Sequence, residues 1–255
     1  MTVLPEHELS TGARPAGASD ESTAAANVQQ MFDTIAPTYD RANHLLSVGI
    51  DRSWWNRTAR VFRPILQHPE TVALDLCCGT GDMTMALLKH RPTTPGAAPI
   101  LAVDFSHQML SLGRKKFTGH NVLPIEADAL HLPIADASVD IVTSAFGFRN
   151  LANYEEGLTE ILRVLRPGGQ LGILECNQPE GLTGAIYNIY FKSILPKLGG
   201  FISGNATAYS YLNSSVERFP RPPRMIELLR NAGFLNGRWT SYTFGAVGLF
   251  HATKQ

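Results

Sequence analysis

The chain has 255 residues, of which 44% are hydrophobic and 17% charged, the balance of a folded domain with a sizeable core. Its 22 basic and 22 acidic residues give a formal net charge of zero, so no charge excess predicts binding to nucleic acid. Of the three cysteines, Cys77 and Cys78 are adjacent, which fits neither a disulfide framework nor a zinc site. We therefore expect no metal and a reducing, cytoplasmic setting.

The first 26 residues are rich in Ala, Ser, Thr, Gly and Pro and lack the apolar run of a signal peptide. This composition predicts a disordered tail over residues 1–26, ahead of a single domain over residues 27–255. Residues 28–62 have a helical pattern that we expect to break at Pro37 and at Gly49. No apolar run reaches the roughly 18 residues that span a membrane.

Strands and helices alternate from residue 71 onward. We predict five strands, then two closing strands, over residues 71–76, 100–104, 122–127, 139–146, 170–176, 238–243 and 246–253. Helices are predicted at 82–90, after a Ser106 cap, near 158–165 and at 223–231. The alternation predicts an α/β fold with a doubly wound, mostly parallel seven-stranded sheet. Residues 178–215, rich in aromatic and aliphatic side chains, form an expected helical insertion after the fifth strand.

A glycine loop follows the first predicted strand, in the stretch ALDLCCGTGDMT. Gly79 and Gly81 allow a ligand to approach the backbone at the carboxyl end of that strand. The loop lacks the lysine of a phosphate-binding loop, and Asp82 at the start of the next helix would oppose a pyrophosphate. The loop therefore favours a cationic or zwitterionic ligand such as S-adenosyl-L-methionine (SAM) over ATP or a dinucleotide.

Aspartates lie at the ends of three successive predicted strands, at Asp75, Asp104 and Asp128. Asp104 stands where an acid can accept hydrogen bonds from both hydroxyls of a ribose. Asp128, followed by Ala129, stands where a carboxylate can accept from an adenine amino group. The same aspartates could instead cap helices or turns, and spacing alone leaves this alternative open.

Several long stretches resemble the ubiquinone/menaquinone biosynthesis C-methyltransferase family, which belongs to the class I SAM-dependent methyltransferases. They are MFDTIAPTYDRANHLLSVGIDRSWW, LDLCCGTGDMT, EADALHLPIADASVDIVTSAFGFRN, RVLRPGGQLGILE and ATAYSYLNSSVERFP. The resemblance implies methyl transfer from SAM to a ring carbon of a polyprenylated quinol, with demethylmenaquinol favoured. The ubiquinone precursor 2-methoxy-6-polyprenyl-benzoquinol, or another small phenol or lipid, is the alternative substrate. A dehydrogenase and a non-catalytic nucleotide-binding protein are the competing functional classes.

The resemblance also implies a set of site residues. By match of motif, the residues that contact SAM are Thr84, Asp104, Asp128 and Ala129, and the same site includes Gly79, Gly81, Asp75 and Tyr39. Ala145 departs from the serine that some members of the family carry.

In the stretch FGFRN, Arg149 can stabilise a phenolate, and Asn150 can orient the ring hydroxyl or a water. The structural alternative for Arg149 is an ion pair with Glu155 or Glu156. A base acting through water is left open among Asp128, His44 and His131.

Residues 27–66 are implied to form a helical lid over the cofactor. Within them, Trp54 and Trp55 are adjacent, so we do not expect both to face inward. The insertion over 178–215, with Tyr190 and Phe191 beside lysines, is expected to contact a membrane surface, a second copy of the chain, or the core.

Overall fold

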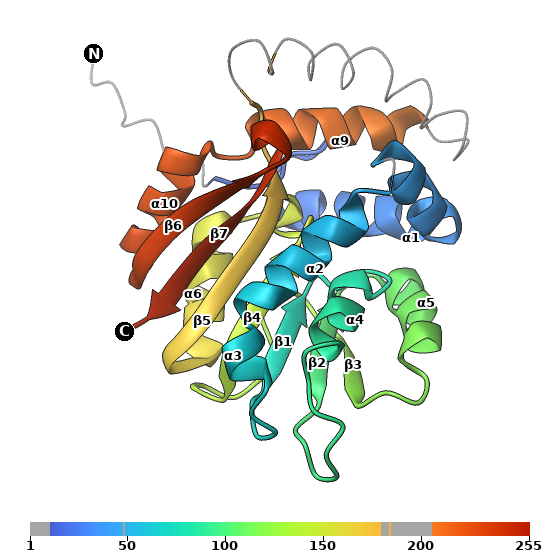
Figure 1. The fold of residues 1–255 in the computed structure, drawn as a ribbon. Coiled ribbons are helices and arrows are strands. Elements are labelled where there is room, and N and C mark those ends of the chain that lie inside the picture. Colours follow the sequence, from blue (N-terminus) through green and yellow to red (C-terminus); the bar gives the residue numbers. More distant parts are fainter. Residues whose placement is uncertain (1–10, 48, 180–183, 185–205) are drawn as a thin grey trace.

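The structure is a computed structural model that describes residues 11–47, 49–179, 184 and 206–255. At its centre is a seven-stranded sheet with the order β3-β2-β1-β4-β5-β7-β6 (Figure 1). The strands are β1 (Ala73–Leu76), β2 (Ile100–Asp104), β3 (Val122–Glu126), β4 (Val139–Ala145), β5 (Leu165–Cys176), β6 (Phe234–Tyr242) and β7 (Val247–Lys254). Only β7 pairs antiparallel, with β5 and with β6, so the predicted mostly parallel sheet is confirmed.

Helices cover both faces of the sheet. Those between or beside strands are α4 (Asp82–Leu88), α5 (His107–Phe117), α6 (Tyr154–Val164) and α10 (Pro222–Asn231). Ahead of the sheet come α1 (Glu21–Leu46), α2 (Asp51–Val61) and α3 (Arg63–Leu66), and α9 (Ala206–Arg218) follows β5. The described residues also form two short 3-10 helices, η1 (Phe148–Asn150) and η3 (Thr243–Gly245).

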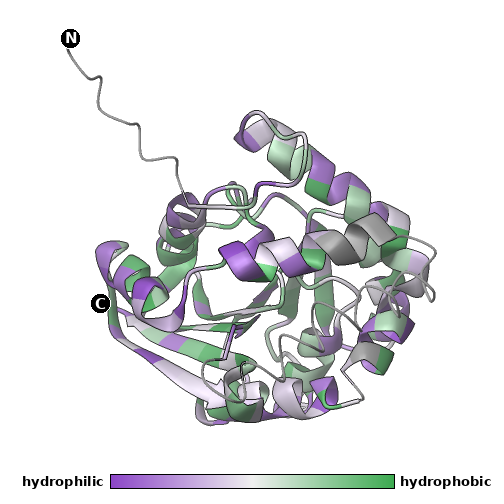
Figure 2. Ribbon diagram, turned by 90° about the horizontal axis from the view of Figure 1, so that it is seen from above, coloured by the Kyte–Doolittle hydropathy of each residue, from purple (hydrophilic) through white to green (hydrophobic). Residues whose placement is uncertain are grey.

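The apolar pattern of the sequence explains this layering. Leu158 and Ile161, one helical turn apart on α6, are fully buried in the core on one face of the sheet. Ala59 and Phe62 belong to a second buried cluster, which packs α2 and α4 on the opposite face. Seen from above, apolar segments concentrate in the sheet and on the helix surfaces next to it (Figure 2). Ser106 caps α5 as predicted, since its hydroxyl accepts from the Met109 amide.

Helix α1 runs unbroken through Pro37, so the predicted break at this residue is wrong. Proline removes one backbone hydrogen bond, and here it lies on the exposed side of the helix. The turns on either side are held from outside the helix: Asp33 accepts from Ser106 Oγ at 2.6 Å, and Asp40 accepts from Thr80 Oγ1 at 2.5 Å. The break at Gly49 is confirmed, because α1 ends before it and α2 begins after it.

The predicted disordered tail is wrong for residues 11–26, and residues 1–10 lie outside the described part of the chain. Asp20 caps α1 by accepting from the Thr23 amide, so the helix starts at Glu21 rather than after residue 26. Ala13 is 2% exposed, and its amide donates to the Leu151 carbonyl at 2.8 Å. Because these are tertiary contacts of a small-residue segment, local composition alone gave no sign of them.

Most of the expected insertion, including Tyr190 and Phe191, lies outside the described residues. Its end forms α9. None of the described helices combines the length and hydropathy needed to cross a membrane.

Candidate functional site

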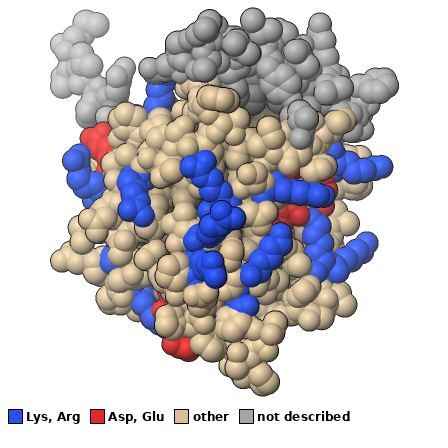
Figure 3. Space-filling view, viewed as in Figure 1, with Lys and Arg blue, Asp and Glu red and all other residues tan. Residues whose placement is uncertain are grey.

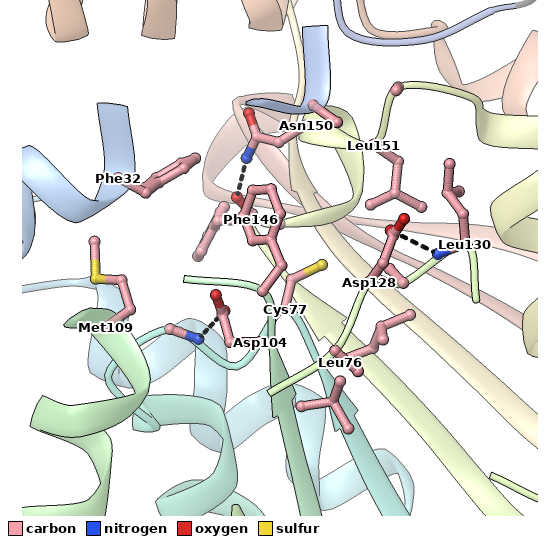
Figure 4. A pocket seen from close by; sticks show the side chains of 18 of the residues that line it. Phe32, Leu76, Cys77, Asp104, Met109, Asp128, Leu130, Phe146, Asn150 and Leu151 are labelled. Carbon is pink, nitrogen blue, oxygen red and sulfur yellow. Dashed lines mark hydrogen bonds between the residues drawn. The ribbon is translucent and has the colours of Figure 1, made fainter. Parts of the chain in front are cut away.

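Two adjoining cavities open at the carboxyl ends of the parallel strands. β1 pairs with β2 on one side and with β4 on the other, so strand order reverses at β1. Ligands of doubly wound sheets bind at such a switch point. The loop cavity, which borders Gly79, Asp104 and Asp128, has about 730 Å³ of space with its mouth included (Figure 4).

The glycine loop shapes one wall of the loop cavity. Gly79 has a left-handed φ of 54°, and its amide donates to Asp104 Oδ2 at 2.7 Å. Gly81 also has a positive φ, 89°, and caps α4. It does not line the cavity: a Cβ there would lie 2.3 Å from the ring of Phe117, so this glycine is required for packing.

Asp104 ends β2 and is nearly buried. Besides the Gly79 amide, it accepts from the Ser106 amide at 2.9 Å. A carboxylate has about four acceptor positions, so two remain for the hydroxyls of a ligand. Burial raises the pKa of Asp104 to about 6, while the two amide hydrogen bonds act in the opposite direction.

Asp128 and Ala129 line the same cavity beyond β3. Asp128 accepts from the Leu130 amide at 3.0 Å and is largely exposed (Figure 4). This contact agrees with the alternative interpretation of the sequence, in which Asp128 caps a turn. The second carboxylate oxygen lies 3.4 Å from His131 Nδ1.

Asp75 and Thr84 have a different place from the one the motif implied. Thr84 is fully buried and donates to Asp75 Oδ2 at 2.6 Å, and Thr143 donates to the other oxygen at 3.0 Å. Burial raises the pKa of Asp75 to about 7. Thr84 lines neither cavity, whereas Asp75 borders the aromatic cavity, and the pair fastens β1 to α4 and β4 beneath the loop.

The FGFRN stretch forms a tight turn between the two cavities. Phe146 has a left-handed φ of 58°, uncommon for a residue other than glycine. Its carbonyl accepts from Arg149 Nη1 at 2.5 Å. A Cβ on Gly147 would lie 2.3 Å from that of Cys77, so only glycine fits the close approach of this turn to β1.

Arg149 is buried in an ion pair with Glu175, at the end of β5, with Nη1 2.8 Å from Oε2. The alternative partners named from the sequence, Glu155 and Glu156, are therefore wrong. Burial alone would lower the pKa of Arg149, but the Glu175 carboxylate outweighs it and raises the pKa. Glu175, itself fully buried, also accepts from the Arg149 amide. Its position as the one acid in an apolar strand was the sequence signal for this contact.

Asn150 borders both cavities, as does Tyr39. The Tyr211 hydroxyl donates to Asn150 Oδ1 at 3.2 Å, and the amide nitrogen is 3.4 Å from the Phe146 carbonyl. Burial raises the pKa of Tyr39 to about 12. The structure thus brings together Arg149, Asn150 and Tyr39 where the cavities meet.

The second space, here the aromatic cavity, is lined by side chains of α1, α2, β4 and α9. Its aromatic residues are Phe32, Tyr39, Trp54, Trp55, Phe146 and Tyr211. Trp54 and Trp55 both line it, so the expectation that only one faces inward is wrong. Successive helix positions point about 100° apart, and the cavity wraps around that much of α2. His44 and His131 line neither cavity.

Lys116 on α5 was missed in the sequence, where the loop itself supplies no lysine. Its ammonium lies 2.8 Å from both Asp40 of α1 and Asp82 of α4, and 3.1 Å from Thr80 Oγ1. The two carboxylates leave this group with a net negative charge, so it adds no phosphate site. It ties α1 to the glycine loop.

The charges of the loop cavity indicate the class of its ligand. Its charged lining residues within the described chain are Asp104 and Asp128, with no Lys, Arg or His. A phosphate would lack a counter-charge there, whereas a sulfonium and hydroxyl donors suit the two carboxylates. A glycine loop, a ribose-type acid and this charge define the class I SAM-dependent methyltransferases.

Comparisons with known proteins agree. A SAM-dependent methyltransferase from Thermotoga maritima has a similar fold, with a TM-score of 0.60, 20% identity, and coverage of 89% of this chain and 100% of that one. A second, from Aquifex aeolicus, has a TM-score of 0.56 and 19% identity, and covers 78% of this chain and 89% of that one. The model of the ubiE/COQ5 methyltransferase family matches residues 19–254.

This chain belongs to the ubiE/COQ5 methyltransferase family, and its cofactor is SAM. Among its relatives is a Deinococcus radiodurans protein named demethylmenaquinone methyltransferase, which is 44% identical over 240 residues, 92% of this chain and 96% of that protein. A relative of the same name from Thermus thermophilus is 44% identical over 222 residues, 86% of this chain and 97% of that protein.

Proposed function

We propose that this protein methylates a ring carbon of demethylmenaquinol, a polyprenylated quinol. The observation that carries the proposal is the 44% identity, over nearly the full length of both chains, to relatives named for this substrate. The geometry supports it, because the loop cavity and the aromatic cavity meet at residues that line both, among them Tyr39, Phe146 and Asn150. A donor in one and an aromatic ring in the other would be in contact.

We propose that SAM occupies the loop cavity, where Asp104 accepts from its ribose hydroxyls and Asp128 from its adenine amino group. Gly79 and Ala129 provide walls without a large side chain against which the nucleoside can lie. Thr84 and Gly81 line neither cavity and support this wall from behind, and Asp75, which borders the aromatic cavity, is held by the Thr84 hydroxyl. When bound, SAM supplies an electrophilic methyl group.

Arg149 is the residue proposed to activate the ring. Carbon methylation of a quinol is faster when the neighbouring hydroxyl is ionised, because the phenolate raises electron density at the ring carbon. A guanidinium that borders the aromatic cavity stabilises that phenolate and remains charged at every working pH. Glu175 and the Phe146 carbonyl fix its orientation, so the charge is in place before the ring arrives.

Asn150 and Tyr39 are proposed to position the reactants. Contacts with Tyr211 and Phe146 hold the Asn150 amide between the cavities, where it can orient the ring hydroxyl. Tyr39 keeps its proton, since burial raises its pKa to about 12, and its hydroxyl can therefore donate a hydrogen bond. The aromatic walls exclude water from the sulfonium.

Incubation with methyl-labelled SAM tests the substrate. Demethylmenaquinol and 2-methoxy-6-polyprenyl-benzoquinol are supplied separately, and label in each quinol is measured. We expect label in the first. Label only in the second would transfer the proposal to the ubiquinone precursor, and SAM binding with no label in either would favour a non-catalytic protein.

Arg149→Lys tests the assigned role, because it keeps a charge for Glu175 but loses the planar, bidentate donor. We expect kcat to fall about 100-fold with the Kd for SAM unchanged. An equal loss of SAM affinity would place Arg149 in the cofactor site instead.

A further inference from the structure

Phe244 is an exposed aromatic residue that the methyl-transfer site does not use. It lies in η3, the turn between β6 and β7, and 87% of its surface is exposed. Its backbone is left-handed, with φ 55° and ψ 28°. That conformation costs a residue with a side chain roughly 1–2 kcal/mol, and no packing in the described structure compensates for it.

Phe244 lies next to the mouth of the aromatic cavity. The neighbouring Thr243 lines that cavity, and its hydroxyl accepts from Trp54 Nε1 at 2.7 Å. Ile50, one helical turn before Trp54, lines it too and is 43% exposed. Leu45, at the end of α1, is 53% exposed. Ile50 and Phe244 are thus exposed beside the aromatic cavity, and Leu45 is exposed five residues before Ile50.

Basic side chains surround these apolar ones. Arg41 is exposed one turn before Leu45 on α1, and Arg52 and Arg57 are exposed on α2. Arg57 also lies 4.1 Å from the ring centre of Tyr242, which begins the η3 turn. Lys and Arg side chains gather over this face, with few acidic ones among them (Figure 3).

This basic face is unbalanced although the whole chain is neutral. The sequence has one acidic residue within 41–67 and 236–246, which is Asp51. Its side chain is buried against His44. Within the described part of the chain, Arg52 forms no ion pair. A surface of opposite charge is therefore the partner that this face fits.

We propose that Leu45, Ile50 and Phe244, with Arg41, Arg52 and Arg57 around them, form a docking surface for an anionic lipid bilayer. The inference rests on the proposed function, because a polyprenyl quinol keeps its tail in the bilayer while its ring must reach the aromatic cavity. The apolar tips enter the interface and the arginines contact the headgroups. A second copy of the chain fits poorly, since a two-fold interface would oppose arginines to arginines.

The position of Arg60 on α2 provides a control for the role of Arg52. Arg60 lies eight residues after Arg52, about 12 Å along the helix axis. That exceeds the screening length of about 8 Å at physiological salt. Arg60 should therefore contribute much less than Arg52, which makes it a matched control on the same helix.

Vesicle sedimentation of the whole protein tests the surface. We expect binding to vesicles of phosphatidylcholine with 30% phosphatidylglycerol, at roughly physiological salt, and much weaker binding to phosphatidylcholine alone. Phe244→Asn, which tolerates the left-handed backbone, should weaken binding about tenfold. Arg41→Gln and Arg52→Gln should each weaken it about fivefold. Arg60→Gln and Leu235→Ser, at the far end of β6, are the controls and should change it less than twofold.

Activity on two substrates separates this proposal from the methyltransferase function. With long-tailed demethylmenaquinol in the vesicles, kcat/KM of Phe244→Asn should fall with its vesicle affinity. With a water-soluble short-tailed analogue, the variant should equal wild type. The docking surface would be overturned if wild type bound both kinds of vesicle equally. It would also be overturned if the Phe244, Arg41 and Arg52 variants bound vesicles as tightly as wild type. A change from dimer to monomer in Phe244→Asn by sedimentation velocity would overturn it too. Absence of methylation of either substrate would overturn the function while leaving the vesicle result readable.

Discussion

Glu175 determines where the charge of Arg149 is held. Its carboxylate accepts from both the side chain and the backbone of Arg149, in a pocket that excludes water from the acid completely. Two opposite charges buried together offset each other's desolvation, whereas either one alone would carry that cost unopposed. Glu175 is thus a positioning residue for the proposed phenolate stabilisation.

Glu175→Gln should separate these effects. We expect the free energy of unfolding to fall by about 3 kcal/mol, because the guanidinium loses its buried counter-charge. We also expect kcat to fall, while the Kd for SAM stays unchanged. Urea unfolding and steady-state kinetics check both. Glu227→Gln, which removes an exposed ion pair with Arg224, is the control and should alter neither. A stable variant with normal kcat would show that Glu175 does not position Arg149.

Asp104 makes SAM binding dependent on pH. Hydroxyl donors prefer its ionised form, and burial holds its pKa near 6 before ligand binds. We therefore expect the Kd for SAM to rise as pH falls below about 6, approaching tenfold per pH unit. Calorimetric titration from pH 5 to 8 measures this. Asp104→Asn should bind weakly and without that pH dependence, while the exposed Asp136→Asn should behave as wild type. A flat wild-type profile would remove Asp104 from the ribose site.

At the scale of elements, α1 is held over the loop cavity by polar contacts as well as by buried apolar side chains such as Val28 and Ala36. Lys116 joins Asp40 of α1 to Asp82 of α4, and Gln29 donates to the Phe105 carbonyl at 2.6 Å. Partly exposed ion pairs are weak individually and are screened by salt, so these can open while the core of the sheet stays packed. That is what a lid over a cofactor requires.

Lys116→Met should loosen this helix. We expect a several-fold faster dissociation of SAM and faster amide exchange in residues 21–46, because both acids lose their shared cation. Stopped-flow displacement and hydrogen exchange are the measurements. Lys115→Met removes the exposed neighbouring lysine and should leave both rates as they are. Unchanged exchange in Lys116→Met would mean that other contacts hold α1.

The elements predicted correctly from the sequence are those that depend on contacts between residues close together in the chain. β2 covers the predicted residues 100–104, and Ser106 caps the next helix through a contact three residues away. The helix break predicted at Pro37 was wrong because Asp33 and Asp40 are held by residues 40 or more positions distant. Glu175 was missed for the same reason, since it meets Arg149 only when β5 lies beside β4. Local pattern thus located the site, and long-range pairing decided which residues face it.

At the scale of the whole molecule, the site depends on how β1 is fixed at the centre of the sheet. Asp75 of β1 accepts from Thr143 of β4 and from Thr84 of α4, so one carboxyl group joins three elements directly under the glycine loop. The unfolded chain releases this proton near pH 4, whereas the folded protein holds it up to a pKa of about 7. Between these values the folded state binds one proton more than the unfolded state. Raising the pH across that window therefore lowers the free energy of unfolding.

Asp75→Asn should remove this contribution. An amide is neutral at every pH and can still accept from one threonine while it donates to the other. We expect urea unfolding of wild type, compared with the variant, to lose a further 2–4 kcal/mol or so between pH 5 and pH 8. His251 acts in the opposite direction, because burial lowers its pKa to about 4, but its contribution is common to both proteins and cancels in the comparison. Identical pH profiles would mean that Asp75 is ionised in the folded protein, and that the junction under the loop holds a buried charge.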